Sequence, residues 1–335
     1  MITISQYATN KLNAGPKAKI DIERILKKEF KSKIYTLRLT GNEGNGSYIT
    51  DFNYKIKKAI FAMKYLHGED ITIIQIPFIN DTRFTKNLKN KIAFIHDLDG
   101  IRKQDKKIEK REINFLLSCN YIVAHNEKMK MYLIEKGIEK EKIYTLEMFD
   151  YLCEIKEKDI KAFDSSNVQV VYTGNLDKAS FIKQLDSEKM NFRINVYGTK
   201  NDIIKNEKIQ YKGKYKPDEL PNYIEGDLGF VWDGNVDESD ESIGFKNYTK
   251  YNNPHKLSCY LAAGIPVIVW EKSAVSEFIT KYDVGYTINS IYDINEIDFS
   301  DYEIKRENAK RISDKVRSGF FTKNVIEKII EKISL

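Results

Sequence analysis

The chain has 335 residues, of which 41% are hydrophobic and 12% aromatic, which suffices for two packed domains and excludes global disorder. Its 55 basic and 49 acidic residues leave a net charge of +6, too small and too mixed to predict a nucleic-acid-binding surface. No apolar run reaches membrane-spanning length, and the first fifteen residues lack the apolar core of a signal peptide. We therefore expect a cytoplasmic protein.

In the first half of the chain, short apolar runs alternate with amphipathic stretches. Such alternation predicts a parallel sheet covered by helices on both faces. The expected strands are Ile2–Tyr7, Ile34–Leu37, Ile71–Ile76, Ile92–Ile95, Tyr121–Ala124 and Ile143–Leu146. The expected helices are Ile20–Phe30, Tyr54–Tyr65 and Glu127–Lys136.

The pattern starts again after a charged stretch, Lys156–Val168, in which we interpret Asp164–Asn167 as a linker. The strands expected beyond it are Val168–Thr173, Ile194–Tyr197, Leu228–Trp232, Val267–Val269 and Val284–Ile288. The fold class is therefore α/β, with Rossmann-like doubly wound domains over residues 1–160 and 167–315. Residues 316–335 follow, and their amphipathic helix is expected to pack back on the first domain. Ligands bind at the carboxyl ends of parallel strands, so we expect the site in a cleft between the domains.

The segment Lys250–Trp270 predicts a helix whose N-terminus could bind an anion, followed by a strand. Asn253 is the expected N-cap and Pro254 the first helical residue. Lys256 and Tyr260 then share one face of the helix. A helix dipole, unpaired N–H groups and a lysine together suit a phosphate or diphosphate. The alternative is an ordinary helix start with a solvent-exposed lysine.

Other strand ends of the second half carry small, aromatic or polar residues that suit a nucleotide. Glycine lets a ligand approach the backbone, lysine contacts phosphate, and an aromatic ring borders a base. The residues concerned are Gly174, Asn175, Lys178, Tyr197, Gly198, Trp232 and Asp233. A tryptophan at such a place is also a common core residue.

The first half offers a possible base and a possible donor contact. His96 and Asp97 follow an expected strand, where either could take a proton from a substrate. His125 ends the next strand in the same way. Gly15 and Lys17 precede a helix and could approach phosphate, although a simple turn explains them equally well. For His96 and Asp97 the alternative is hydrogen bonding to the adjoining loop.

Further features of the sequence bear on metal binding and on membrane contact. The three cysteines and four histidines are scattered, which disfavours a metal site. Asp97-Leu98-Asp99 matches a DxD pattern, but we interpret it as a strand end plus loop. A basic cluster is either a solvated helix face or a patch for anionic lipid headgroups. Its members are Arg102, Lys103, Lys106, Lys107, Lys110 and Arg111.

Several segments together resemble a family of bacterial GT-B glycosyltransferases. They are NAGPKAK, FIHDLDGIR, YIVAHNEKM, VVYTGNLDK, FVWDG, GFKNYTKYNNPHKLSCYLAAGIPVIVW and the closing SGFFTKNVIEKII. The resemblance runs over nearly the whole chain. It is strongest to β-1,6-galactofuranosyltransferases of O-antigen and capsular polysaccharide assembly. A related branch comprises glucosyltransferases that extend N-acetylglucosamine on serine-rich-repeat adhesins.

The resemblance implies an inverting, metal-independent transferase without a cofactor, whose UDP-hexose donor is a co-substrate held mainly by the C-terminal domain. By motif, Asn175 and Lys178 would lie near the donor phosphates, and Asn253 with Lys256 would hold the diphosphate. Tyr197 would lie near the uridine, and His255 and Tyr260 are further expected donor contacts. Gly15 and Lys17 would approach the donor from the N-terminal domain. Asp97, or His96 beside it, would deprotonate the acceptor.

UDP-galactofuranose is the favoured donor, and the acceptor is a glycan on lipid or protein. The alternatives are the adhesin glucosyltransferase and a non-catalytic partner subunit of the same fold. Contact with the inner membrane surface and self-association are further expectations, whereas nucleic-acid binding is not expected.

Overall fold

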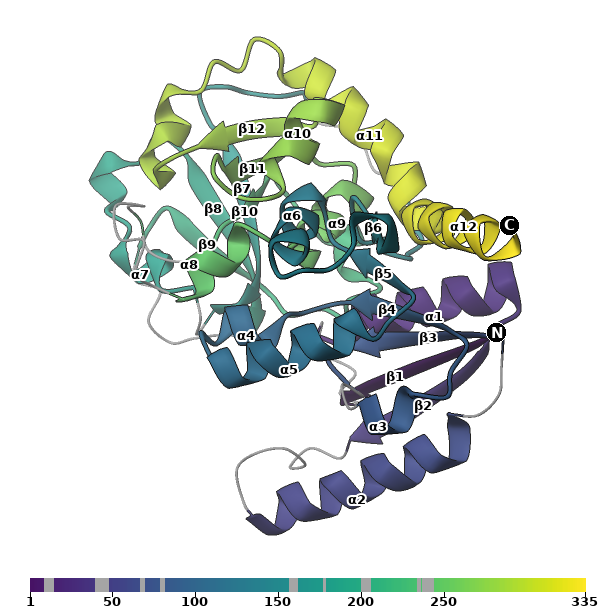
Figure 1. Cartoon of the computed structure of the whole chain (residues 1–335). Helices are drawn as coiled ribbons and strands as arrows, with labels where there is room; N and C mark the ends of the chain where they lie inside the picture. The colour runs from purple at the N-terminus through teal and green to yellow at the C-terminus, as the bar shows by residue number, and fades with distance from the viewer. Residues whose placement is uncertain are drawn as a thin grey trace. The chain divides into compact units, whose positions relative to one another are not determined.

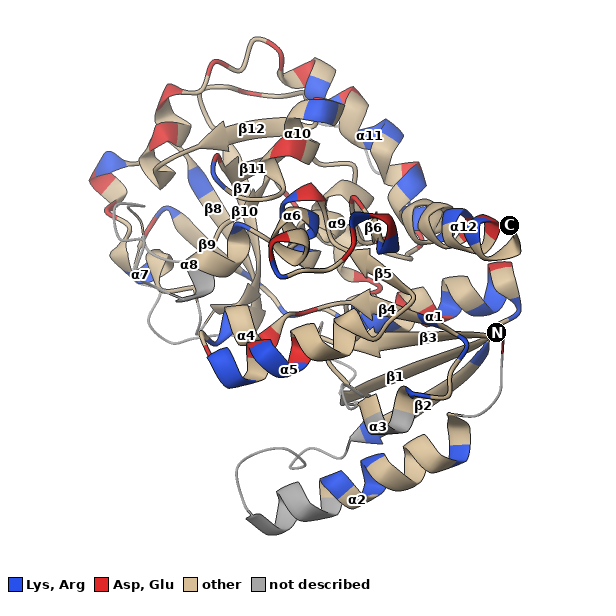
Figure 2. Cartoon of the chain, viewed as in Figure 1, with Lys and Arg blue, Asp and Glu red and all other residues tan. Residues whose placement is uncertain are grey.

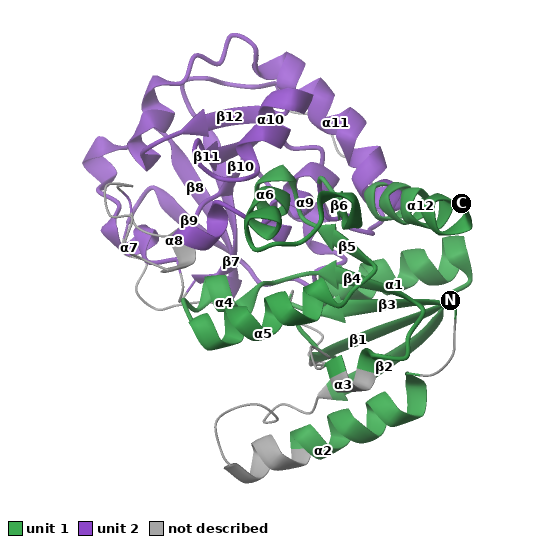
Figure 3. Cartoon of the chain, in the orientation of Figure 1, with its two compact units in different colours: residues 1–147, 321–335 green, residues 148–320 purple. Residues whose placement is uncertain are grey.

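The computed structural model describes residues 1–8, 15–39, 48–66, 70–78, 82–156, 162–176, 179–199, 206–233, 236 and 244–335. It divides the chain into two compact units. Unit 1 comprises Met1–Glu147 and Phe321–Leu335, and unit 2 comprises Met148–Phe320 (Figure 3).

Unit 1 is built on a parallel six-stranded sheet with the strand order β2-β1-β3-β4-β5-β6 (Figure 1). Its central strands are buried on both faces, as a sheet covered by helices on both sides requires. The strands are β1 (Ile2–Ala8), β2 (Lys33–Leu39), β3 (Ile71–Ile76), β4 (Asn90–Ile95), β5 (Tyr121–Ala124) and β6 (Ile143–Thr145).

The chain of unit 1 first moves outward from β1 to β2 and then returns past β1 to β3. Because crossovers between parallel strands are right-handed, this reversal puts the first two long helices on opposite faces of the sheet. The last helix joins the first, since Lys323 Nζ lies 3.2 Å from Glu29 Oε2. The helices are α1 (Lys17–Phe30), α2 (Tyr48–Tyr65), α3 (Thr82–Thr85), α4 (Asp99–Arg102), α5 (Lys106–Leu117), α6 (Glu127–Glu135) and α12 (Phe320–Ser334), with a 3-10 turn η1 (Lys140–Lys142).

Unit 2 repeats the plan with the strand order β12-β11-β10-β7-β8-β9, again all parallel. The core of one face is aromatic, with Phe181 packed edge-on against Tyr172 and Phe230. The strands are β7 (Gln169–Asn175), β8 (Arg193–Thr199), β9 (Ile209–Gly213), β10 (Leu228–Val231), β11 (Val267–Trp270) and β12 (Gly285–Ile288).

The helices of unit 2 connect these strands, and the last of them leads out of the unit. They are α7 (Phe181–Gln184), α8 (Gly244–Thr249), α9 (His255–Ala262), α10 (Ser276–Tyr282) and α11 (Tyr302–Ser318). The 3-10 segments are η3 (Ser187–Lys189), η4 (Leu220–Asn222) and η5 (Ile291–Glu296). Gly319 ends α11 in the left-handed conformation, with φ 85°, which turns the chain into α12.

The expectation of two Rossmann-like units with a C-terminal helix returning to the first is confirmed. Every expected strand is present, with ends shifted by at most a few residues. The strand β9 was not expected. It forms the edge of its sheet and is only half-buried along most of its length, so its sequence IQYKG lacks an apolar run.

The division between the units falls earlier than the charged stretch suggested. Met148, Phe149 and Tyr151 are buried side chains of unit 2, and the Tyr151 N–H donates to the Val316 carbonyl. This short apolar segment joins the core of unit 2 before the charged residues begin. Residues 157–161, within the charged stretch, lie outside the described residues.

The start of α9 differs by one residue from the expectation. Pro254 is the N-cap, with an extended ψ of 130°, and the helix begins at His255. Asn253 is therefore not the cap, and no side chain caps this helix. The reason is local: Pro254 keeps its fixed φ of −66° but takes an extended ψ, so the first helical turn forms one residue later.

Among the described residues, no helix combines the length and apolar character needed to cross a membrane.

Candidate functional site

The carboxyl ends of β7 and β10 form the switch point of unit 2. From β7 the chain continues to β8 on one side, whereas β10 lies on the other side of β7. Ligands of doubly wound sheets bind at such a reversal. The helix α9 stands over this point, because its Tyr260 hydroxyl accepts from the Thr173 N–H on β7 and donates to the Phe230 carbonyl on β10.

Lys256 is the charged centre of this region. Its Nζ lies 2.9 Å from Asp233 Oδ1, donates to the Trp232 carbonyl at 2.9 Å and sits 4.5 Å from the centre of the Tyr172 ring. Burial alone would lower the pKa of this ammonium, but the Asp233 carboxylate and the neighbouring tyrosines raise it above its ordinary value. The side chain is therefore a fixed cation at the switch point.

Tyr260, also predicted as a donor contact, is bonded to the sheet in this structure. The side chain is fully buried, and the Thr173 N–H donates to its hydroxyl at 2.7 Å. Burial raises the pKa of this phenol well above its ordinary value. Its ring also fills the space beside Gly229, where an added Cβ would lie 2.3 Å from the ring. Tyr260 fastens α9 to the sheet.

Gly174 and Asn175 lie exposed at the end of β7, where a ligand can reach the backbone. Gly198 pairs with Gly174 across the sheet, and both have a φ of 152°, a conformation favoured by glycine. A Cβ at Gly198 would lie 2.0 Å from the Gly174 carbonyl oxygen. The two glycines thus let the ends of β7 and β8 approach closely. Lys178, expected beside them, lies outside the described residues.

Two aromatic residues expected near the nucleotide are buried instead. Tyr197 is only 2% exposed, accepts from the Glu225 N–H and donates to the Tyr223 carbonyl. Trp232 is also 2% exposed and stacks on Phe230. Both rings belong to the core of unit 2, because other residues of the same unit cover them. Trp232 contributes its carbonyl oxygen to Lys256.

Asn253 and His255 flank the start of α9. Asn253 is 6% exposed, and the His255 ring stacks on Tyr151 with centroids 4.9 Å apart. Phe149 meets the same imidazole edge-on. The predicted donor contacts that the structure brings together at the switch point are therefore Asp233 and Lys256, while the imidazole is held among aromatic rings of unit 2.

Unit 1 has a corresponding switch point between β1 and β3, and polar side chains gather there. Lys19 on α1 donates to the Gln6 carbonyl at 3.0 Å, and the Gln75 amide donates to the Lys19 carbonyl. That bond fixes Gln75 with its oxygen toward His96 Nε2, 2.7 Å away. In the neutral ring the proton therefore sits on Nε2, and Nδ1 carries the lone pair.

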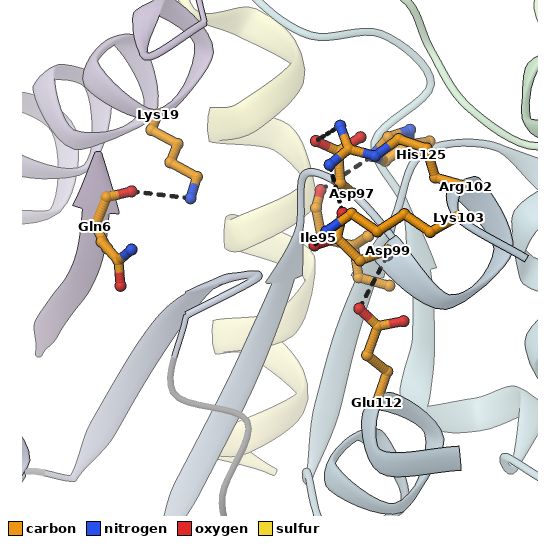
Figure 4. Close-up of polar contacts among 9 residues, drawn as sticks. All are labelled: Gln6, Lys19, Ile95, Asp97, Asp99, Arg102, Lys103, Glu112 and His125. Atoms are coloured by element: carbon orange, nitrogen blue, oxygen red, sulfur yellow. Dashed lines mark hydrogen bonds and ion pairs between the residues drawn. The ribbon is translucent and has the colours of Figure 1, made fainter. Parts of the chain in front are cut away.

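Asp97 follows His96 and is held by Arg102 of the short helix α4. Arg102 lies 3.2 Å from Asp97 Oδ2 and 2.5 Å from Asp99 Oδ1 (Figure 4). Lys103 also pairs with Asp99. At this DxD sequence the expected loop after the strand covers Asp97 and Leu98, whereas Asp99 begins the short helix α4. One guanidinium bridges both carboxylates of the DxD sequence, and Asp97 keeps 34% of its side chain exposed.

A buried acid, Glu112, holds the backbone just after Asp97, and it was not among the site residues expected from the sequence. The Glu112 carboxylate accepts the N–H groups of Asp99 and Gly100, both at 2.9 Å. Burial raises its pKa to about 7, against the lowering effect of these two bonds. Gly100 packs so closely on α5 that a Cβ would meet the Glu109 backbone at 2.4 Å.

Of the two lysines in the first turn of α1, Lys19 reaches this region, whereas Lys17, the predicted donor contact, is buried. Lys17 is 3% exposed and pairs with Asp21 of its own helix at 2.6 Å, while Gly15 lies exposed before the helix. Burial lowers the pKa of Lys19 to about 8, against the nearby charges of Asp97 and Glu23. Figure 4 shows the Lys19 side chain extending from α1 beside Gln6.

A signal for Lys19 was present in the sequence. The first turn of α1 contains no acidic residue and carries lysines, the reverse of what the helix dipole favours. By contrast, His125, considered as a second possible base, has its ring nitrogen 3.1 Å from the Ile95 carbonyl and is 1% exposed. Burial lowers its pKa to about 3. This imidazole is a neutral core group.

Residues 1–148 match the family described as Glucosyltransferase 3-like, N-terminal domain, and residues 170–329 match its C-terminal domain. The chain belongs to the glucosyltransferase 3-like family. The first match ends at residue 148, beside the division between unit 1 and unit 2, and the second begins at residue 170.

Relatives of this glucosyltransferase 3-like chain carry two different names. The chain is 31% identical over 285 residues to beta-1,6-galactofuranosyltransferase WbbI of Escherichia coli K12, covering 80% of this chain and 81% of that protein. It is 27% identical over 276 residues to Glucosyltransferase 3 of Streptococcus parasanguinis, covering 78% of each. The protein is a glycosyltransferase.

Solved structures confirm the GT-B fold. Sucrose-phosphate synthase of Thermosynechococcus elongatus matches over 100% of both chains with a TM-score of 0.65 and 9% identity. At such low identity the likeness concerns the fold alone.

Proposed function

We propose that this protein transfers a hexose from a UDP-sugar to a sugar hydroxyl of a growing bacterial glycan, with inversion and without a metal. Galactofuranose is the favoured sugar, because the relative with 31% identity is named a galactofuranosyltransferase. The observation that carries the proposal is the fixed Lys256 cation beside the exposed glycine end of β7. A cation and a helix N-terminus together suit a departing diphosphate.

The chemistry at unit 2 is leaving-group stabilisation. Breaking the bond between the sugar and UDP develops negative charge on the β-phosphate, and a preorganised ammonium lowers the energy of that charge. Lys256 is held in place by the Trp232 carbonyl and by Asp233, so little reorganisation is needed when charge develops. Gly174 and Asn175 would give the phosphates access to the backbone at the same strand end.

The chemistry at unit 1 is proton removal from the acceptor. Asp97 is partly exposed and oriented by Arg102, and His96 is oriented by Gln75. Either group could accept the acceptor proton as the new bond to the anomeric carbon forms. Asp97 is our first choice, because its carboxylate reaches solvent. The bridging of Asp97 and Asp99 by Arg102 supports a metal-independent reaction, since the guanidinium already occupies the space between both acids where a metal ion would bind.

A second candidate is glucosyl transfer to N-acetylglucosamine on a serine-rich-repeat adhesin. The relative named Glucosyltransferase 3, at 27% identity, favours it. A third possibility is a non-catalytic partner subunit. The presence of Lys256 and Asp97, which suit diphosphate binding and proton removal, disfavours it.

A donor panel tests these proposals. The purified chain is incubated with UDP-galactofuranose, UDP-galactopyranose or UDP-glucose in the presence of EDTA, with glucosyl and N-acetylglucosaminyl acceptors. Turnover with the furanose alone supports the leading proposal, and turnover with UDP-glucose alone supports the second. Activity that EDTA abolishes and added divalent ions restore would overturn metal independence. The anomeric configuration of the product, read by NMR, tests inversion. Absence of both UDP binding and turnover would favour the non-catalytic subunit, whereas UDP binding without turnover would point to a missing acceptor or an untested donor.

A further inference from the structure

The helix α2 of unit 1 carries an exposed apolar stripe. Ile56 is 42% exposed, Ile60 55% and Met63 65%. With 3.6 residues per turn, these side chains fall within an arc of about 60° on one face of the helix. The opposite face is the packed one, where Phe61 and Ala62 contact the sheet core around Ile4.

No other part of the described chain shows such a stripe. The remaining exposed large apolar side chains stand singly on different parts of the fold, as isolated surface residues commonly do. They are Leu117, Met131, Tyr223, Ile304, Phe320 and Leu335. A contiguous stripe calls for a partner, whereas single residues do not.

The charges around the stripe are all positive. Between Tyr54 and Leu66 the sequence contains four lysines and no acidic residue. Lys55 lies on one side of the stripe, and Lys57 and Lys64 lie on the other, at about 70–110° from its centre. Figure 2 shows blue but no red along the coloured part of α2. The described part of α2 thus presents an apolar centre with cations along both margins.

This arrangement selects one kind of partner. Helices that lie in a membrane interface bury an apolar stripe among the acyl chains while lysines beside it contact anionic headgroups. We propose that α2 docks the protein on an anionic lipid surface through Ile56, Ile60 and Met63. A second copy of the chain fits less well, because a symmetric pairing of α2 with itself would oppose lysines to lysines.

The basic cluster on α4 and α5 is a weaker surface for lipid. Arg102 and Lys103 pair with Asp99, and Glu109 and Glu112 interrupt the lysines of α5. That cluster has charge without an apolar stripe, so it lacks the insertion component that α2 provides. We therefore assign the membrane contact to α2 and not to the basic cluster, where it was expected from the sequence.

The test is flotation of the full chain with vesicles of phosphatidylcholine alone or mixed with phosphatidylglycerol. The wild type is expected to float with the anionic vesicles, and less so as salt rises. Lys55→Gln with Lys57→Gln and Lys64→Gln should lower the partition coefficient about a hundredfold. Ile56→Ser with Ile60→Ser and Met63→Ser should lower it about tenfold or more.

Two matched variants serve as controls. Leu117→Ser with Met131→Ser and Ile304→Ser removes three exposed apolar groups elsewhere, and Lys106→Gln with Lys107→Gln and Lys110→Gln removes three lysines from α5. Both should float like the wild type. Unfolding temperatures and UDP release with a soluble acceptor show that each variant is folded.

The proposal is overturned if the wild type does not float, if the α2 variants float unchanged, or if the α5 variant loses as much binding as they do. Sedimentation equilibrium provides the remaining outcome. If the α2 variants turn a dimer into a monomer without changing flotation, a second copy covers the stripe and lipid does not. The vesicle result is independent of donor identity, so failure of the donor panel would leave it standing.

Discussion

Lys256 and Asp233 form an ion pair at the switch point of unit 2, with 2.9 Å between Nζ and Oδ1. The two partners differ in their access to water: the lysine side chain is 14% exposed and the aspartate 38%. The ammonium is therefore held from the protein side while the carboxylate faces outward. An arriving diphosphate would compete with Asp233 for the same cation.

This competition predicts opposite effects for the two partners. Lys256→Met should weaken UDP binding and lower transfer at least about a hundredfold, because the leaving group loses its cation. Asp233→Asn should keep UDP binding or tighten it, because the lysine loses only its competitor. Calorimetric titration with UDP measures both. Lys272→Met, an exposed lysine of the same unit, is the control. Wild-type UDP affinity in Lys256→Met would rule out the phosphate role.

The acceptor base can be separated from its ion-pair partner. Asp97→Asn should lower kcat about a hundredfold or more if Asp97 removes the acceptor proton. Asp99→Asn is the matched control, because it also removes an ion pair with Arg102 but leaves Asp97 in place. Equal losses in both variants would mean that the acids act through Arg102. If His96→Gln causes the larger loss instead, the imidazole is the base.

We expect the Lys19 side chain to lower the stability of the folded protein and to be required for transfer activity. Its pKa in the folded protein, about 8, is below the ordinary 10.5, so the folded state releases this proton first. The contribution of Lys19 to stability therefore rises with pH between about 8 and 10.5. Lys19→Met should unfold at higher urea than the wild type at pH 7 and lose transfer activity. Lys28→Met, exposed on the same helix, should change neither. A destabilised, fully active Lys19→Met would contradict this assignment.

His125 predicts an acid-sensitive fold. Its folded pKa of about 3 lies below the ordinary 6.5, so only the unfolded chain takes up the proton between these values. Stability is thus lost as pH falls from about 6.5 toward 3, by about 2 kcal/mol from this residue at pH 5. Urea unfolding at pH 7 and pH 5 measures the loss. In His125→Gln the difference between the two pH values should be smaller by that amount, and an unchanged difference would count against the burial argument.

Gly198 and Gly174 share an unusual φ but differ in the space around them. Gly198→Ala should destabilise the protein by about 3 kcal/mol or more, because its Cβ would overlap the Gly174 carbonyl. Gly174→Ala has no atom closer than 3.6 Å, so only backbone strain of about 1–3 kcal/mol is expected. Thermal unfolding of the two variants tests the order, and a reversed order would be inconsistent with the close approach of β7 and β8.

The sequence by itself determined the architecture. Buried parallel strands need continuous apolar runs, and runs such as Ile71–Ile76 and Tyr121–Ala124 mark β3 and β5 to the residue. It also pointed to Lys256 and Asp97, because the ends of parallel strands and the start of the following helix are local features of the chain. The edge strand β9 escaped this reasoning, since a half-buried edge does not require apolar residues on both faces.

Only the tertiary structure decided which of the candidate side chains are buried and which remain accessible. Tyr260 and Tyr197 were predicted as ligand contacts from their positions. The Tyr260 hydroxyl bonds to the backbone of β7, and the Tyr197 hydroxyl bonds to the backbone of the segment before β10. Lys17 and Lys19 are alike in sequence, but one pairs with Asp21 inside unit 1 and the other reaches the end of β1. Burial and hydrogen-bond partners come from elements distant along the chain, and spacing within one segment does not contain them.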